Sequence, residues 1–434
     1  MSLDPRILKE SFSRLENEPG KAAGFFYGRL FAENPRLRAL FPPAMGAQCD
    51  RLFHALGRIV WSQDSPDELS AYLARLGRDH RRFGVLPEHY PAVGAALIAT
   101  LRTFAAEVWS AEAEAAWSAA YRSACDTMIA AAERDAATAP PWWVAEVVEH
   151  DRRAADLAVL TLRPDASLPY TAGQYVPVQT ARWPRVWRPY SIANAPRPDG
   201  LLSLHVRALP AGWVSGALVR HTRRGDTVLL GPAMGTMTLD PDSGRDLLLV
   251  AGGTGLAPAK ALVEQLAASG HRRDVHLLMG ARTARDLYDL ADLRRLESEH
   301  PWLKVVPVLS DAPDGERDGD VPHRPHGPLP DVLERLGGWD GHDAYVAGPA
   351  PMVRRTVTVL QRLGLPLTRV HHDLLRAEEI PSPDGPRPRV QPPGQARSVG
   401  SVGSVGSVGS GEAAEATEAA VSGGTGVARQ RHGG

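Results

Sequence analysis

The sequence predicts a multidomain protein with an all-α domain, then an antiparallel β-barrel, then an α/β domain built on a parallel sheet. Its 434 residues are too many for one hydrophobic core. Three changes of pattern support this division: helical periodicity, then short strands between turns, then strands that alternate with helices. They place the domains at residues 1–137, 138–241 and 242–376, followed by a tail at 377–434.

The first domain is predicted to be helical because its apolar residues recur at spacings of three and four. Phe25, Phe26 and Leu30 form one such run, and Leu97 and Leu101 belong to another. Prolines fall between these runs or at their starts, as expected of residues that end or open helices. The segment 138–142 (Thr-Ala-Pro-Pro-Trp) is the predicted hinge into the next domain.

The second domain is predicted to be a barrel because its strands are short, with few helices between them. The expected strands are 143–150, 157–162, 174–180, 201–209 and 227–230.

The third domain is expected to alternate strands with crossover helices, which is typical of a parallel sheet. Its buried-strand candidates are 247–250, 275–279, 305–309 and 344–346. Beyond Ala377, proline-rich sequence and four Ser-Val-Gly triplets (398–409) cannot bury enough apolar surface to offset the entropy of ordering, so disorder is expected there.

The composition excludes several classes of protein. A formal net charge of −1 argues against a nucleic-acid partner or an anionic membrane surface. No apolar run approaches the roughly 20 residues that span a bilayer, and the N-terminus lacks the pattern of a signal peptide. Cys49 and Cys125 are the only cysteines, which fits a reducing cytoplasm and is too few for a four-thiolate iron–sulfur cluster.

A flavin-binding motif is indicated by residues 188–191. An arginine can neutralise a diphosphate with paired donors, while a tyrosine can lie against a flavin ring and a serine can hydrogen-bond it. Taken alone, Arg188 and Tyr190 would be interpreted as an ordinary pair on a barrel strand. With its neighbours, the motif resembles the ferredoxin-reductase-like family, which implies FAD contacts from Tyr175, Arg188, Pro189, Tyr190, Ser191, Arg207, Gly212, Trp213, Val214 and Ser215.

A second motif joins a strand to a helix through a glycine turn at residues 252–258. Glycines allow close backbone approach, and the helix N-terminus offers unpaired N–H groups to a pyrophosphate. The spacing Gly253-x-Gly-x-x-Pro258 departs from the standard dinucleotide fingerprint, as it does in the same reductase family. The predicted nicotinamide-dinucleotide contacts here are Gly252, Gly253, Thr254, Gly255, Leu256, Ala257 and Pro258.

Two later segments resemble nicotinamide-binding segments of that family. Ala347 stands where the family has a cysteine, so no thiol can take part in the hydride step here. Arg282 and Arg285 could meet a 2′-phosphate or could be solvated surface residues, which leaves NADH or NADPH open. The predicted contacts are Gly280, Ala281, Arg282, Ala347, Gly348, Pro349 and Met352.

The helical domain resembles the globin domain of flavohaemoglobins, and the resemblance extends over nearly all of residues 1–375. It implies that His80 is the axial ligand of haem b and that Phe41 packs on the porphyrin. Tyr27 and Gln48 become the distal hydroxyl and amide, and Tyr90 a tyrosine on the proximal side. An imidazole can hold ferrous iron while the opposite face stays open.

The family also has a proximal glutamate and a C-terminal aromatic residue. The glutamate position falls on Ala132, so Glu133 is the expected substitute, with Asp126 as the alternative. Leu374 stands where the aromatic residue is expected.

The resemblance implies a cytoplasmic nitric oxide dioxygenase that uses NADH or NADPH, FAD and haem b to convert O2 and NO to nitrate. Two alternatives remain open: a flavin reductase serving an external acceptor, and a globin-based oxygen or redox sensor acting on an unidentified partner. No nucleic acid and no membrane insertion are expected.

Overall fold

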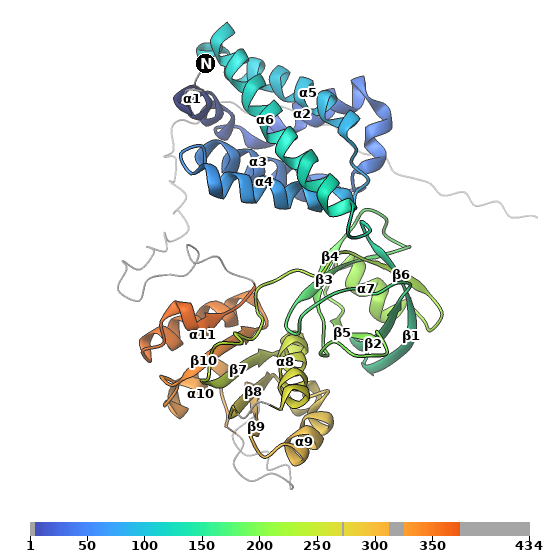
Figure 1. Ribbon diagram of the computed structural model, residues 1–434, viewed down its shortest axis with the longest axis vertical. Coiled ribbons are helices and arrows are strands. Elements are labelled where there is room, and N and C mark those ends of the chain that lie inside the picture. Colours follow the sequence, from blue (N-terminus) through green and yellow to red (C-terminus); the bar gives the residue numbers. More distant parts are fainter. Residues whose placement is uncertain (1–4, 271–272, 312–324, 374–434) are drawn as a thin grey trace, which may run out of the picture. The chain divides into compact units, whose positions relative to one another are not determined.

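The computed structural model describes residues 5–270, 273–311 and 325–373 (Figure 1). The predicted disorder of the tail and the missing aromatic side chain at Leu374 lie outside the described residues. Within them, the three predicted classes of domain are confirmed in the predicted order: helical, antiparallel β, and parallel α/β.

Over residues 5–137, the helical domain contains six α-helices, and three short 3-10 helices lie between them. Pro19 and Pro66 each open a helix, at a position where the missing N–H costs nothing. Ser110 caps the last helix, since its hydroxyl accepts a hydrogen bond from the Ala113 amide at 3.1 Å. The helices are α1 (Pro5–Glu16), α2 (Pro19–Glu33), α3 (Gly46–Trp61), α4 (Pro66–Arg81), α5 (Tyr90–Phe104) and α6 (Ala111–Ala136).

The apolar faces of the helices pack together in the core of this domain. Phe12, Phe26 and Leu101 are almost completely removed from solvent. Burying a side chain of this size contributes about 1.5–3 kcal/mol, so the periodic apolar residues are the ones that hold the helices together.

The second domain is a six-stranded antiparallel sheet in the order β4-β3-β6-β1-β2-β5. An antiparallel bridge between Ile192 and Leu204 joins the end of β4 to β5, and this brings the two sheet edges together. The elements are β1 (Trp143–Ala154), β2 (Leu157–Pro164), β3 (Tyr175–Thr180), β4 (Arg188–Ser191), β5 (Leu202–Arg207), α7 (Trp213–Arg220) and β6 (Thr227–Leu230).

The third domain is a five-stranded parallel sheet in the order β11-β10-β7-β8-β9. The chain runs outward from β7 through β8 to β9 and then returns to place β10 on the other side of β7. In parallel sheets, ligands bind at the carboxyl ends of the strands where the order reverses in this way. Gly252 ends β7 and Ala347 ends β10, so both lie at this switch point.

The elements of this domain are β7 (Asp246–Gly252), α8 (Leu256–Ser269), β8 (Val275–Ala281), α9 (Leu290–Glu299), β9 (Leu303–Leu309), α10 (Leu329–Leu336), β10 (His342–Ala347), α11 (Ala350–Arg362) and β11 (Val370–His371). Across the described ranges, no helix combines the length and the apolar character that crossing a bilayer requires.

Candidate functional site

Five residues predicted to surround a haem line the helical-domain part of one large cavity, whose other walls come from the FAD-binding and NAD-binding domains. They come from different elements and are far apart in sequence: Tyr27, Phe41, Gln48, His80 and Tyr90. The Tyr27 and Phe41 rings meet edge to face with centroids 5.5 Å apart. This apolar contact fixes the direction of the phenol.

Tyr27 is held as a neutral hydrogen-bond donor. Burial raises the pKa of Tyr27 to about 12, so the phenol keeps its proton near neutral pH. Its hydroxyl lies 3.4 Å from the backbone oxygen of Gln48, which is a long and therefore weak hydrogen bond. The donor can turn to a stronger acceptor inside the cavity.

His80 presents one ring nitrogen to the cavity. Its Nδ1 lies 2.7 Å from the backbone oxygen of Leu76, one helical turn earlier on α4. Burial lowers the pKa of His80, which favours the neutral imidazole that metals require. Within the described ranges, Nε2 has no hydrogen-bond partner, so the ring is oriented by one nitrogen and the other is left for a ligand.

The structure does not bring Glu133 to this cavity, contrary to the sequence prediction. Residues 121, 124, 125 and 128 of α6 line it, at helical spacings of three and four. Continuing that spacing reaches Ala131 and Ala132, whereas Glu133 is turned to solvent. Asp126 is exposed as well, so neither carboxylate takes the proximal place that the resemblance implies.

Tyr90, at the start of α5, packs on side chains of α4 and α6. It packs against an apolar cluster that includes Leu73 and Met128, and burial raises the pKa of Tyr90 to about 12. The Tyr121 hydroxyl donates to the Tyr90 backbone oxygen at 2.7 Å, which holds α5 against α6.

Two arginines that were not predicted also line the cavity. Burial lowers the pKa of Arg51, and the neighbouring cations Arg188 and Arg82 lower it further. The Nε of Arg82 is buried and has no partner among the described residues. Two such cations suit the two propionate carboxylates of a haem, so with His80 this donor set fits the group. Little in the sequence indicates that these two arginines belong to the site, except that Arg82 follows His80 by two positions.

The flavin-motif residues lie where β3 pairs with β4. Tyr175 is opposite Ser191 and Val176 is opposite Tyr190 in the ladder. Arg188 is exposed; its guanidinium donates to the Trp187 backbone oxygen and has no carboxylate partner among the described residues. It therefore remains available to a diphosphate. Pro189 is exposed beside it on β4.

The second flavin segment starts helix α7. Gly212 precedes the helix, and the Ser215 hydroxyl accepts from the Leu209 amide at 3.2 Å. Val214 is buried in the barrel core, while Trp213 stacks on Trp183 with centroids 4.8 Å apart. The backbone of this turn, rather than the side chains of Val214 and Ser215, is thus free to meet a cofactor.

Arg207 is held by two ion pairs beside its predicted cofactor contacts. Its guanidinium pairs with Asp156 at 2.7 Å and with Asp286 at 3.3 Å. These two ion pairs hold the guanidinium in place, and Arg207 also lines the cavity, so donors remain for a diphosphate.

The glycine turn lies against the end of β10. A Cβ on Gly255 would fall 2.3 Å from the backbone oxygen of Ala347, so only glycine permits this approach. Gly253 has φ +56 and open space where a Cβ would stand. Leu256, Ala257 and Pro258 are buried in the first turn of α8, and Thr254 is half-buried above them.

The remaining nicotinamide-motif residues lie at the same edge of the sheet. The turn after β10 and the start of α11 approach Gly252 closely, since a Cβ on Gly252 would fall 3.2 Å from the Pro349 Cδ and 2.7 Å from the Met352 Cε. Gly280 and Ala281 end β8, and Arg282 follows them, exposed. Together with the glycine turn, these residues line a cavity whose backbone is open to a dinucleotide: Gly252, Gly253, Thr254, Gly255, Ala257, Pro258, Gly280, Ala281, Arg282, Ala347, Gly348, Pro349 and Met352.

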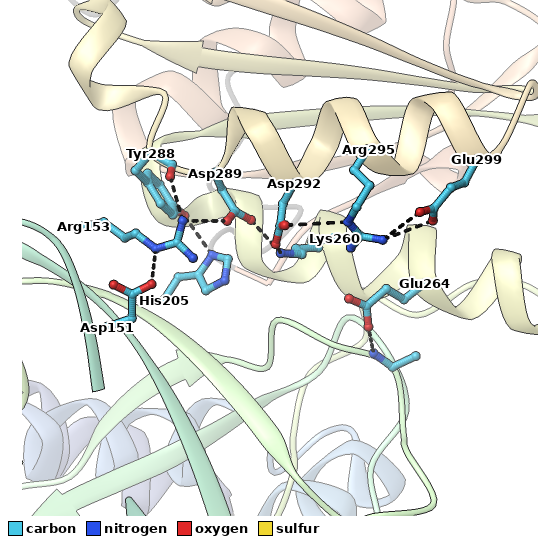
Figure 2. Close-up of polar contacts among 11 residues, drawn as sticks. Asp151, Arg153, His205, Lys260, Glu264, Tyr288, Asp289, Asp292, Arg295 and Glu299 are labelled. Carbon is cyan, nitrogen blue, oxygen red and sulfur yellow. Dashed lines mark hydrogen bonds and ion pairs between the residues drawn. The ribbon is translucent and has the colours of Figure 1, made fainter. Parts of the chain in front are cut away.

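His205 on β5 predicts a pH dependence of stability. Burial, assisted by Lys260 and Arg153, lowers the pKa of His205 to about 3, and the neutral ring Nδ1 accepts from the Tyr288 hydroxyl at 2.9 Å (Figure 2). The unfolded chain takes up a proton near pH 6.5, whereas the folded chain does not. Stability must therefore fall as the pH drops from about 6.5 towards about 3, by up to about 1.4 kcal/mol per pH unit.

The variant His205→Gln tests this pH dependence. Its amide oxygen can still accept from Tyr288, but it does not titrate. We expect the urea midpoint to fall less between about pH 7 and about pH 5 in the variant than in the wild type. Equal falls in the two proteins would show that His205 is not a source of acid sensitivity.

Comparison with known proteins agrees with this arrangement. Residues 24–128 match the globin family, residues 144–238 the oxidoreductase FAD-binding domain and residues 249–358 the oxidoreductase NAD-binding domain. The flavohemoprotein of Bordetella pertussis is 29% identical over 402 residues, covering 86% of this chain and 98% of the relative. That of Chromobacterium violaceum is 28% identical, covering 85% and 96%.

A solved structure, the flavohemoglobin of Malassezia yamatoensis with bound FAD and heme, has the same fold. Its TM-score is 0.64 at 19% identity, and the match covers 83% of this chain and 97% of that one. The reductase part alone is 34% identical to the xylene/toluene monooxygenase electron transfer component of Pseudomonas putida, over 50% of this chain and 61% of the relative. The chain thus belongs to the flavohemoprotein family, with a globin domain that precedes FAD-binding and NAD-binding oxidoreductase domains.

Proposed function

We propose that this protein is a nitric oxide dioxygenase that oxidises NADH or NADPH and converts nitric oxide and dioxygen to nitrate. The observation that carries the proposal is that Tyr27 and His80 line one cavity. The Tyr27 phenol is neutral, and the His80 imidazole has its Nε2 free of hydrogen bonds to the described residues. When bound, FAD would accept hydride and haem b would take electrons singly and supply the oxygen chemistry.

In the helical domain, each residue has a role in holding or polarising. His80 would hold the iron, with its ring oriented by the Leu76 carbonyl, and Arg51 and Arg82 would hold the propionates. Tyr27 donates a hydrogen bond towards a reactant that gains negative charge, and a buried donor acts there without reorganisation. We assign Gln48 to the same wall and Tyr90 to packing on the proximal side.

In the reductase domains, the backbone does most of the binding. The glycine turn at residues 252–255 brings main-chain N–H groups and the start of α8 to a pyrophosphate. Arg188 neutralises the diphosphate of FAD, and Tyr190 lies beside it on β4. Ala347 has a small apolar side chain at the end of β10. It would therefore contribute to nicotinamide binding by steric fit.

Removing the Tyr27 hydroxyl tests the polarising role. Phenylalanine keeps the contacts with Phe41 and loses only the donor. A hydrogen bond to a charged group is worth about 1.5–3 kcal/mol, so Tyr27→Phe holoenzyme should consume nitric oxide about 10- to 100-fold more slowly. Haem content and the rate of flavin reduction should not change.

The matched control is Tyr170→Phe, which removes a hydroxyl that donates to the Ala195 oxygen at 3.0 Å, away from the cavity. It should leave nitric oxide consumption near the wild-type rate. Equal rates in Tyr27→Phe and wild type would contradict the assigned role of Tyr27.

A second candidate function is a reductase that serves an external acceptor. The 34% identity between the reductase part and a monooxygenase electron transfer component favours it. That function gives residues 1–137 no role. Purified, haem-reconstituted protein that shows bound flavin but no haem Soret band would support this second function over the first.

A further inference from the structure

An ion-pair network built around one buried carboxylate, that of Asp289, lies outside the motifs described above. It starts at Lys260 on α8, two positions after Pro258 of the glycine turn. The Lys260 ammonium lies 2.7 Å from an Asp289 carboxylate oxygen and 2.9 Å from an Asp292 oxygen (Figure 2). Burial alone would lower the pKa of Lys260, but the two carboxylates outweigh it and hold that pKa above its usual value.

Asp289 extends the network from the NAD-binding domain to the FAD-binding barrel. Its carboxylate is 1% exposed, and its second oxygen lies 3.8 Å from Arg153 at the end of β1. Arg153 also pairs with Asp151 at 2.6 Å and donates to the Tyr288 backbone oxygen at 3.4 Å. One buried carboxylate therefore joins helix α8 to strand β1.

Two further contacts connect the same two domains. The Tyr288 hydroxyl bonds to His205 on β5, and the Ala195 amide, just beyond β4, donates to Glu264 on α8 at 3.1 Å. As Figure 2 shows, these contacts lie in a row along α8 and the start of α9. On either side of Asp289, Tyr288 and Lys260 each make a further hydrogen bond: Tyr288 with His205, and Lys260 with Asp292.

Such a network specifies geometry more than it adds stability. A buried ion pair roughly repays its desolvation cost, whereas leaving one of its charges unpaired is strongly unfavourable. The two domains therefore have one arrangement in which Lys260 and Arg153 both share Asp289. Because α8 carries the glycine turn at its N-terminus, that arrangement also sets where the turn lies relative to the barrel.

We infer that Asp289 is a positioning residue: it fixes the NAD-binding domain on the FAD-binding barrel so that a nicotinamide meets the flavin. This inference rests on the FAD- and NAD-dependent part of the proposed function and is independent of the haem chemistry. Asp289 acts through Lys260 and Arg153, so its effect must be seen in the rate of hydride transfer and in the mobility of the domain boundary.

The test compares Asp289→Asn with wild type, both as FAD-loaded full-length protein. In anaerobic single-turnover mixing with NADH or NADPH, we expect flavin reduction to slow by about 10-fold or more, since misplacement by about 1 Å can cost 10²-fold. Amide hydrogen exchange should rise in 153–157 and in 286–292. Flavin content should stay at the wild-type value.

Two further variants separate positioning from general destabilisation. Glu334→Gln removes an exposed interhelical ion pair with Arg362 in the same domain and should change neither readout. Arg153→Gln should slow flavin reduction like Asp289→Asn, and the double variant should be no slower than the slower single one, because both remove the same link. Arg153 is partly exposed, so this variant serves if Asp289→Asn fails to fold.

Wild-type rates and wild-type exchange in both Asp289→Asn and Arg153→Gln would overturn the inference. Additive slowing in the double variant would overturn it too, because independent effects exclude a shared link. A wild-type flavin that neither NADH nor NADPH reduces would instead overturn the reductase part of the proposed function, so the two failures are distinguishable.

Discussion

Replacing His80 with alanine is expected to abolish haem retention and, with it, nitric oxide consumption. Loss of an outer-shell partner of a metal ligand already costs 10- to 100-fold, so losing the ligand itself should cost more than about 100-fold. Reduction of the flavin by NADH should continue at the wild-type rate, because the NAD-binding turn and Arg188 are untouched. The measurements are the Soret absorbance of reconstituted protein, nitric oxide consumption under air, and anaerobic flavin reduction.

The control for this variant is His54→Ala. His54 is an exposed histidine on α3 that also lines the cavity, so with His89 it is one of the two alternative ligands in this domain. It should bind haem and consume nitric oxide like wild type. Haem loss in His54→Ala together with full activity in His80→Ala would reverse the assignment of the ligand.

Placing a methyl group on Gly255 is expected to slow flavin reduction by NADH or NADPH by about 100-fold, the cost of misplacing a reacting group by about 1 Å. The new Cβ would meet the Ala347 backbone oxygen at 2.3 Å, and neither backbone can yield without moving β10 or the turn. The haem domain should be unaffected. The checks are haem content and the anaerobic rate of flavin reduction in Gly255→Ala.

Alanine substitutions at two other glycines provide comparisons for Gly255→Ala. A Cβ on Gly252 would meet the flexible end of Met352, so Gly252→Ala should slow reduction much less. A methyl group on Gly244, before β7, would have no described atom within 4 Å, and Gly244→Ala should be neutral. Equal rates for Gly255→Ala and Gly244→Ala would show that this close approach is not needed for the reaction.

The sequence predicted the fold well where local pattern decides it. Buried strands such as 247–250 and 275–279 appear as β7 and β8 because a continuous apolar run between turns has few other solutions. Strand β4 was not among the expected strands. It is four residues long, contains Pro189 and is largely exposed, so its identity comes from pairing with β3, which no local pattern reveals.

Site residues could be predicted only where their spacing in the sequence or a backbone requirement identifies them. The glycine turn could be recognised because only glycine permits the approach to Ala347. Glu133 was misplaced because one residue of helical phase, about 100°, separates the cavity face of α6 from solvent. The ion-pair partners of Arg207 and Asp289 could not be predicted, since they lie far away in sequence and are chosen by tertiary packing.

The most direct test of the central proposal is the product balance of haem- and FAD-loaded protein turning over NADH or NADPH with nitric oxide under air. Each nitric oxide takes up one dioxygen and one electron to become nitrate, and each nicotinamide supplies two electrons. We predict one nitrate for every nitric oxide consumed and one nicotinamide oxidised for every two. Nicotinamide oxidation that leaves nitric oxide unconsumed, or that forms no nitrate, would contradict a nitric oxide dioxygenase.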